Sequence, residues 1–371
     1  MKRWLRRLVK ICLICFGLLF FCIAVEVTLG WRCDLQGQIP APSPQPKTRR
    51  TAVADIKGYT RPEDDAYLSL PEWYIVWSYQ EKADFQQNNL PSGFPYFGAV
   101  RQYWSNYCCV SRLTKGKYAS NAGEQVMLVV IGTSFSAEYV LKGLYEKTIG
   151  RLSEWASSRQ STDEDRYAYK VAREYADFVH VRPFYEFRFA RHVKGLWTEN
   201  SLWGEHLGRK WERRVFLSAD YSVEAFYCWL IEKGTHLSYG YEPSDTYAWV
   251  ENVGDAVLPQ SPRVKVLKSM GPHAYIVDIP RYQEFTATAS MLAQRGAHFV
   301  EIAGNSQITV SVLASQTWRG DGLGAQRLFS MPVLTHPGLY RVVMRCDVMS
   351  LDQVLNALHA NSAVVEHVYD Y

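Results

Sequence analysis

The chain has 371 residues, a net charge of +4 and an aromatic content of 14%, with 12 Trp and 24 Tyr. This length leaves room for two domains. Residues 1–50 hold nine basic and two acidic residues, a net +7, so the rest of the chain carries −3 of the total. A slightly acidic body excludes nucleic-acid binding through a basic surface, and the many Trp and Tyr residues fit large amphipathic contact surfaces.

Residues 1–31 predict a membrane anchor. Five basic residues precede an unbroken apolar run, Ile11–Val25, which can continue past Glu26 to Trp31. A membrane-spanning helix needs about 20 mostly apolar residues, and a terminal Trp suits the headgroup region. Because the basic residues lie on the N-terminal side, the positive-inside rule places the N-terminus in the cytoplasm and the body outside it. We therefore expect a single pass through the plasma (inner) membrane.

Two other interpretations of this segment stay open. A cleaved signal peptide also fits, because Thr28 and Gly30 offer small residues at a cleavage site. A lipoprotein signal ending at Cys22 fits less well, because bulky Phe21 stands where a small residue belongs. The retained anchor is the preferred hypothesis.

Residues 32–64 predict a linker. Four prolines fall between Pro40 and Pro46, and a Pro-rich run is a semi-rigid, extended spacer that rises about 3.1 Å per residue. Such a segment would hold the following domains away from the bilayer.

Residues 65–255 predict a mainly helical, aromatic-rich domain. Three segments match the capping-box pattern that starts helices: Ser69–Glu72, Asn121–Glu124 and Ser161–Glu164. A further helix is expected over Tyr221–Lys233, where it would end before a glycine.

The helix that follows Asn121 begins with apolar residues and continues with charged ones. Glu138, Lys142 and Glu146 follow one another at intervals of four residues. Opposite charges at this spacing support one another on a helix surface, so the pattern indicates a solvated face. We therefore expect no second membrane span here.

Within this domain, the segment His180–Trp197 is the densest candidate for function. Drawn as a helix, it gathers basic side chains on one face and aromatic side chains on the other. An ordinary amphipathic helix gives this pattern, but so do a helix lying on anionic lipid and an anion or substrate site. The candidate anion- or lipid-binding residues are Arg182, Glu186, Arg188, Arg191 and His192.

Residues 264–371 predict an α+β sandwich, with two helices over one antiparallel sheet, close to the ferredoxin-like plan with an added strand. Strands are expected over 273–280 and in several later segments, and helices begin near Tyr282 and Leu351. Gly304-Asn305 predicts a hairpin between the strands on either side of it. No repeat of fixed period is visible along the chain.

The cysteines suggest no disulfide framework. Outside the apolar run their number is odd: Cys33, Cys108, Cys109, Cys228 and Cys346. A bridge from Cys108 or Cys109 to Cys228 is conceivable, but we expect no structural disulfide. No metal-ligand spacing and no complete catalytic motif occurs, so neither a metal nor a cofactor is predicted.

The leading hypothesis is a membrane-anchored, non-cytoplasmic binding or assembly protein, an α+β multidomain chain of the cell envelope. Its expected partners are the lipid bilayer and envelope proteins, and no nucleic acid. The alternative is an anchored envelope enzyme that acts on an anionic or sugar-containing substrate, with its site in the His180–Trp197 segment. A deep pocket at Glu186, Arg188 and His192 would favour the enzyme.

Overall fold

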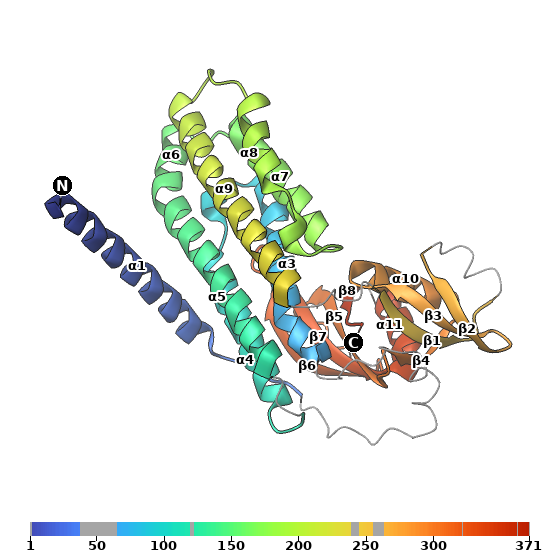
Figure 1. Ribbon diagram of the computed structural model, residues 1–371. Coiled ribbons are helices and arrows are strands. Elements are labelled where there is room, and N and C mark those ends of the chain that lie inside the picture. Colours follow the sequence, from blue (N-terminus) through green and yellow to red (C-terminus); the bar gives the residue numbers. More distant parts are fainter. Residues whose placement is uncertain are drawn as a thin grey trace. The chain divides into compact units, whose positions relative to one another are not determined.

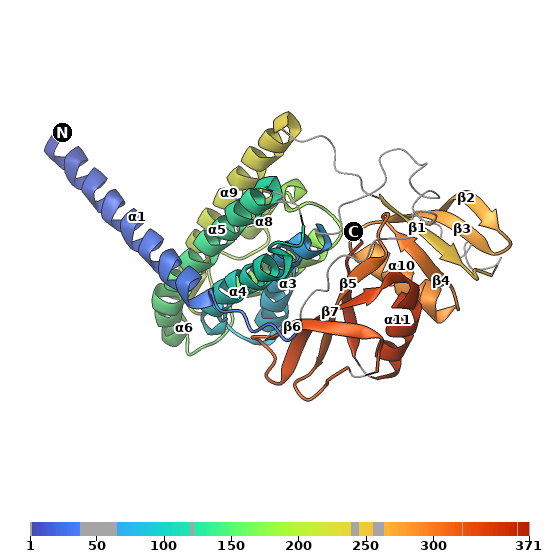
Figure 2. The ribbon, with the colours of Figure 1, turned by 90° about the horizontal axis from the view of Figure 1, so that it is seen from below.

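The computed structural model describes residues 2–37, 65–118, 122–238, 245–254, 263–320, 322–361 and 363–370. Over these residues the chain is mixed α and β, with an apolar helix near the N-terminus and two four-stranded antiparallel sheets (Figures 1 and 2). It divides into two compact units. The helical unit comprises Met1–Arg32, Pro71–Cys108 and Gly123–Gly240, and the sheet unit comprises Cys33–Leu70, Cys109–Ala122 and Tyr241–Tyr371.

The helices of the N-terminal two thirds form one continuous series along the chain. They are α1 (Lys2–Gly30), α3 (Asp65–Asn88), η1 (Pro91–Gly93), α4 (Tyr96–Thr114), α5 (Ala122–Tyr145), the π-helical η2 (Glu146–Gly150), α6 (Arg151–Ala156), α7 (Asp163–Val179), η3 (Phe184–Glu186), α8 (Phe189–Thr198) and α9 (Leu207–Ser238). Because η2 joins α5 to α6 without a break, these three elements act as one long rod.

The core of the helical unit is built from aromatic rings. The ring centroids of Tyr103 and Phe135 are 5.8 Å apart, and those of Phe135 and Tyr139 are 4.2 Å apart. The ring of Tyr103 lies so close to Gly132 that a Cβ at Gly132 would fall 2.1 Å from it. The Tyr103 hydroxyl donates a hydrogen bond to the carbonyl oxygen of Leu128. The glycine thus lets α4 and α5 approach closely.

Helix bounds differ from the sequence predictions in several places. The helix predicted over Tyr221–Lys233 is part of the longer α9, which begins at Leu207 and continues past Gly234 to Ser238. α3 begins at Asp65, so Ser69 lies inside the helix, where its hydroxyl donates back to the Ala66 carbonyl instead of capping. The cap of α7 is Thr162 with Asp165, one residue later than predicted. α5 begins at Ala122, as expected.

The sheet unit contains two sheets and two further helices. Its elements are β1 (Asp245–Glu251), β2 (Lys265–Gly271), β3 (Ala274–Pro280), α10 (Gln283–Gln294), β4 (His298–Ile302), β5 (Gln307–Ser315), β6 (Ala325–Pro332), β7 (Leu339–Asp347), α11 (Leu351–Ala360) and β8 (Val364–Val368). The strand orders are β2-β3-β1-β4 and β6-β7-β5-β8. The unit is therefore a topological duplication, in which three strands, a helix and a fourth strand occur twice in the same arrangement.

One hydrophobic core joins the two halves of this duplication. Ile308, Val310 and Val312 alternate along β5 towards this core, and Phe285 and Leu355 enter it from the two helices. The period of two in β5 correctly predicted that these three residues share a face, and Thr309 and Ser311 on the opposite face are buried too. A polar contact also links the halves, because Arg281 next to β3 pairs with Asp370 after β8 at 3.1 Å, with both side chains buried.

The single predicted sheet is not what forms. β4 and β5 belong to different sheets and share only an isolated bridge between Ile302 and Asn305, so the predicted hairpin at Gly304 is wrong. β1 and β2 were not predicted from the sequence, and β1 lies inside the segment that was expected to be helical. The finer, ferredoxin-like description is not confirmed. The predicted domain boundaries stay predictions, and the proline-rich run 40–46 lies outside the described residues.

The expectation of no structural disulfide is also wrong. Cys33 and Cys109 form a disulfide; their Cα atoms are 5.1 Å apart, and the two residues are 76 positions apart in the chain. Cys108 and Cys228, which the sequence suggested as members of a bridge, are buried and take no part in this disulfide. Spacing could not identify this pair, because the fold brings the end of α1 beside α4: the Glu26 carboxylate accepts hydrogen bonds from the Arg101 guanidinium.

Candidate functional site

The interior of the helical unit is unusually rich in charge. Helices α5–α6 and α9 run antiparallel, and ion pairs connect their inner faces, including Glu146 with Arg213 at 2.6 Å and Glu154 with Arg209 at 3.6 Å. Lys142 and Glu146 were predicted to lie on a solvated face, but both are buried. That prediction is wrong because the i, i+4 pattern shows which residues share a face and not which way the face points.

The basic run at the start of α9 lies entirely inside. Arg209, Lys210, Arg213 and Arg214 are between 1% and 4% exposed. Each is neutralised by acids from α5–α6 or α7: Arg209 pairs with Asp165 at 2.8 Å, Lys210 with Asp163 at 2.9 Å and Arg214 with Glu164 at 2.6 Å. Buried charges require such partners, because an unpaired ion in a low-dielectric interior is very costly.

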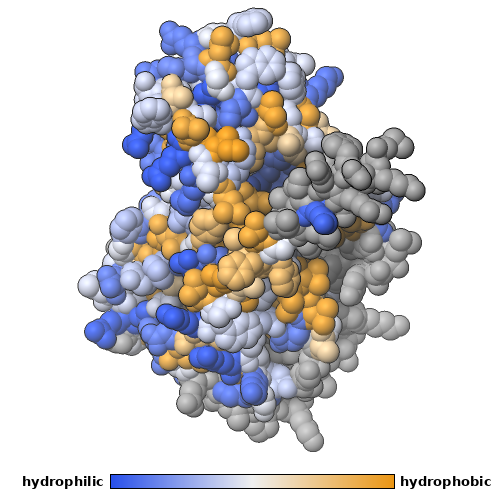
Figure 3. All heavy atoms as spheres, turned by 90° about the vertical axis from the view of Figure 1, so that its left-hand side faces the viewer, coloured by the Kyte–Doolittle hydropathy of each residue, from blue (hydrophilic) through white to orange (hydrophobic). Residues whose placement is uncertain are grey.

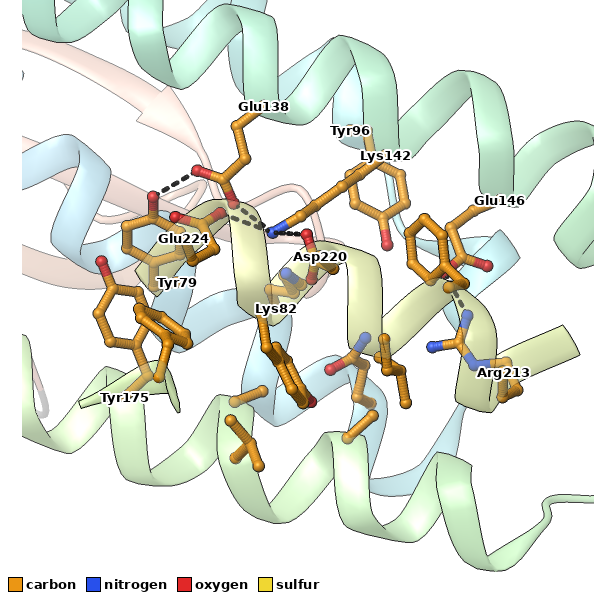
Figure 4. Close-up of a pocket in the computed structure, with 18 residues that line it drawn as sticks. Tyr79, Lys82, Tyr96, Glu138, Lys142, Glu146, Tyr175, Arg213, Asp220 and Glu224 are labelled. Atoms are coloured by element: carbon orange, nitrogen blue, oxygen red, sulfur yellow. Dashed lines mark hydrogen bonds and ion pairs between the residues drawn. The ribbon is translucent and has the colours of Figure 1, made fainter. Parts of the chain in front are cut away.

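A small cavity lies in the middle of this charged interior. The Lys142 ammonium is surrounded by three carboxylates, with Nζ 2.7 Å from Glu138, 3.0 Å from Asp220 and 3.2 Å from Glu224 (Figure 4). The tyrosine hydroxyl of Tyr79 donates a hydrogen bond to Glu138. The cavity walls are largely aromatic and charged, with Lys82, Tyr96, Tyr175, Phe189, Phe216 and Tyr221 among the lining residues.

The electrostatics of the cavity keep one carboxyl close to titration at neutral pH. Burial, reinforced by the nearby Glu138, raises the pKa of Glu224 to about 7. Burial also lowers the pKa of Lys82, and the positive charge of Lys142 lowers it further. The two groups thus both shift towards their neutral forms, as expected for ionisable side chains in a crowded, poorly solvated space.

The cavity is the right size for water and too small for a substrate. Its volume is about 50 Å³, which holds roughly three or four water molecules, whereas small-molecule pockets have several hundred Å³. Two lining acceptors, Gln86 Oε1 and Glu146 Oε2, have no protein hydrogen-bond partner, so water can satisfy them. We read the cavity as part of a polar core and not as an active site.

The exposed side of α9 is apolar, whereas its buried side is charged. Between Leu207 and Leu230 its exposed large side chains are all apolar and are between 39% and 67% exposed: Leu207, Trp211, Val215, Val223, Phe226, Trp229 and Leu230. From Leu207 to Leu230 no charged side chain is exposed. A helix of a water-soluble bundle has the opposite arrangement, with charges in water and apolar residues inside.

The rod α5–α6 continues this apolar surface. Its exposed large residues include Val126, Val130, Leu141, Leu144, Leu152 and Trp155. Among the described residues, Ala122–Ala156 is the one helix long and apolar enough to cross a membrane, and Gly17–Gly30 is a shorter apolar helix. Figure 3 views the molecule from the left-hand side of Figure 1, where α5 and α6 lie, and shows hydrophobic residues across the middle of that side. We call this exposed surface of α5–α6 and α9 the apolar face.

The end of α1 is attached to the same helical bundle. Beyond the Glu26–Arg101 ion pair, Gly30 fits against the Arg101 backbone, where a Cβ would fall 2.5 Å from the carbonyl oxygen. The ring of Trp31 lies 6.4 Å from Trp104 and 5.7 Å from Tyr107. Glu26, a weak point of the apolar run in sequence, is thus paired in the fold.

The predicted site residues do not converge on a cavity. Arg182, Arg188 and Arg191 are exposed; each has a carboxylate partner, Glu186, Glu232 and Glu174 respectively. The helix expected from Pro183 is instead a 3-10 turn, η3, followed by α8 from Phe189. None of the five predicted residues lines the cavity described above.

His192 is the exception to this exposure, because it is buried. Its ring stacks on Phe187 at 5.2 Å. Burial, together with the positive charge of the neighbouring Arg191 guanidinium, lowers the pKa of His192 to about 4. Glu174 approaches to 3.7 Å, but its closer partner is Arg191. This histidine is therefore neutral at physiological pH and packs as an aromatic core residue.

The described residues contain no cluster of three or more His, Cys, Asp or Glu side chains suited to a metal ion. Comparison with protein-family models, with curated proteins and with solved structures gave no match. The apolar face and the buried basic run were missed in the sequence, although a signal was present: Trp211, Val215 and Ala219 follow at intervals of four. That spacing marks an apolar stripe, which is normally assigned to a core.

Proposed function

We propose that this chain is a membrane-anchored protein that acts outside the cytoplasm as a binding or assembly protein. The observation that carries the proposal is the apolar face of the helical unit. Contiguous exposed apolar surface of this kind marks sites where a protein meets another protein or a membrane. The proposal assigns the anchor to α1, with its N-terminus in the cytoplasm.

The disulfide supports the location. Cys33 follows the end of α1 by three residues and is bonded to Cys109. Disulfides form and persist in oxidising compartments and are rare in the cytosol. An oxidised pair directly after the anchor fits a body on the non-cytoplasmic side. Five basic residues before the apolar run favour the same orientation.

The enzyme alternative lacks comparable support. Glu186 and Arg188 lie at the surface, and the charged cavity around Lys142 has room for a few waters only. No site for an anionic or sugar-containing substrate emerges from these residues. Binding through a surface fits the geometry better than catalysis in a pocket.

The orientation can be tested with a reporter fused after Tyr371 that is active only outside the cytoplasm. We expect activity for the native chain. A matched variant in which Lys2, Arg3, Arg6 and Arg7 are replaced by Gln and four Lys are inserted after Trp31 should lose that activity. A native fusion that is inactive outside, and a cytoplasmic reporter that is active at the same site, would overturn the proposed location. Pull-down from detergent-solubilised membranes would then identify any protein partner.

A further inference from the structure

The two sides of α9 differ in charge, which indicates that they face different environments. Its exposed side carries no charge from Leu207 to Leu230, a length of about 36 Å at 1.5 Å per residue. Its buried side carries four basic residues within its first two to three turns, Arg209, Lys210, Arg213 and Arg214, and each pairs with an acidic residue. Charges that face a protein interior while apolar side chains face outward are the pattern of helices in contact with lipid.

Two tryptophans lie near the ends of this charge-free stretch. Trp211 and Trp229 are both exposed and are 18 residues apart, which corresponds to about 27 Å along the helix. Trp155 is exposed at the end of α6, near the start of antiparallel α9. Tryptophan is enriched where protein crosses between hydrocarbon and headgroups, because its ring is apolar and its N–H is polar.

The opposite side of the bundle is charged, so the helical unit cannot be fully immersed in the hydrocarbon layer. α7 lies on the other side of α9 from α5 (Figure 1) and exposes Arg166, Lys170 and Asp177. Charged side chains pointing into acyl chains are strongly unfavourable. The helical unit therefore has one side suited to lipid and one suited to water, as in proteins that lie in the membrane interface.

The position of the anchor helix α1 indicates that lipid, and not a soluble partner, covers the apolar face. α1 is held to α4 by Glu26 and Arg101 and runs on the side of the bundle where α5 and α6 lie (Figures 1 and 2). A bilayer crossed by α1 is thus next to the apolar face. A soluble partner would have to occupy the space that the membrane itself supplies.

We infer that the apolar face of α5–α6 and α9 lies in the interfacial layer of the bilayer that α1 crosses, with acyl chains covering Val215, Val223 and Phe226. The inference rests on the proposed function and names the bilayer as the partner of that surface. On this inference the helical unit is anchored through α1 and also lies on the membrane surface as a monotopic domain. Its helix α7 then faces water.

The test uses the full chain in native membranes. The photo-crosslinker p-benzoylphenylalanine replaces Val215 in one variant and Val223 in another. In the matched control it replaces Lys170 on α7. After irradiation, we expect adducts with the mass of a phospholipid at 215 and 223 and none at 170. An adduct to a polypeptide at 215 and 223 overturns the bilayer inference but supports the proposed assembly function. Equal, background-level labelling at all three positions overturns the inference, while the reporter fusion after Tyr371 tests the location independently.

A second measurement keeps the inference falsifiable if a crosslinker variant is not produced. The purified full chain is reconstituted into vesicles of phosphatidylethanolamine and phosphatidylglycerol with brominated acyl chains, which quench tryptophan fluorescence on contact. We expect the quenched fraction to fall in a variant that carries both Trp211→Phe and Trp229→Phe. The buried Trp77→Phe variant should retain it. An unchanged quenched fraction in the double variant would contradict lipid contact at this face.

Discussion

Arg214 and Glu164 form an ion pair that solvent does not reach. Arg214 Nη2 lies 2.6 Å from Glu164 Oε1, and both side chains are at most 1% exposed. The guanidinium also donates to the carbonyl oxygens of Asn200 and Ser201 and lies over the rings of Trp197 and Trp211. One buried pair thus joins α7, the α8–α9 loop and α9.

Removal of one member of this pair should strongly destabilise the helical unit. We expect Glu164→Leu to lower the free energy of unfolding by about 3–5 kcal/mol, because the arginine is left as an uncompensated buried charge. The double variant with Arg214→Met should recover part of the loss. Thermal unfolding of the detergent-solubilised chain measures both. The control is Arg166→Met, which breaks an exposed pair with Asp163 and should cost less than about 1 kcal/mol; an equal loss would contradict the argument.

The Cys33–Cys109 disulfide should contribute substantially to stability. Cross-linking residues 76 positions apart removes chain entropy from the unfolded state worth about 4 kcal/mol at 25 °C in the loop-closure model. We expect the double variant Cys33→Ser, Cys109→Ser to melt at a lower temperature than the native chain. Reductant should lower the melting temperature of the native chain and leave that of the variant unchanged. A reductant effect of equal size on both would assign the loss to another cause.

Stability should fall when the pH is lowered from about 6.5 to 4 because of His192. In the folded chain its pKa is about 4, below the value of about 6.5 in the unfolded chain. The unfolded state therefore binds the proton first, and the contribution present above pH 6.5 is lost as the pH falls, up to about 3 kcal/mol. His192→Phe keeps the stacking on Phe187 and should flatten this part of the profile. An unchanged slope in the variant would show that other groups produce it.

Glu224 should act in the opposite direction. Its pKa in the folded chain, about 7, lies above the unfolded value of 4.5. The folded state then holds its proton longer, so this contribution is present at pH 4.5 and is lost as the pH rises through 7. We expect Glu224→Gln to be more stable than the native chain at pH 8, by roughly 2 kcal/mol, and little changed at pH 5. A variant that is less stable at pH 8 would indicate that the ion pair with Lys142 outweighs burial.

Two helical glycines should respond oppositely to the same substitution. A Cβ at Gly132 meets the Tyr103 ring at 2.1 Å, whereas nothing lies within 4 Å of a Cβ at Gly208. We expect Gly132→Ala to destabilise the chain by about 1–3 kcal/mol, because it forces the ring away from α5. Gly208→Ala should stabilise it by roughly 0.5 kcal/mol through helix propensity. Thermal unfolding compares the two, and a stabilising Gly132→Ala would mean that α4 and α5 can separate freely.

Several features could be predicted because they depend on local pattern. The apolar helix near the N-terminus, the helical and aromatic character of the middle segment, and the strict alternation of Ile308, Val310 and Val312 in β5 all follow from residue periodicity. These signals extend over neighbouring residues, so the sequence by itself determined them.

The candidate site depends on which way each helix face points and on which residues far apart in the chain pair with one another. Only the tertiary structure decided these two things. The periodicity of α9 reveals two faces, but not that the basic face points inward, because that depends on acids brought from α6 and α7. Glu138 and Lys142 likewise reveal a shared face and not its burial. The partner of Cys33 is 76 positions away, and the two halves of the sheet unit share a strand order without a visible sequence repeat. In each case the deciding energy comes from groups distant in the chain, where local pattern carries no information.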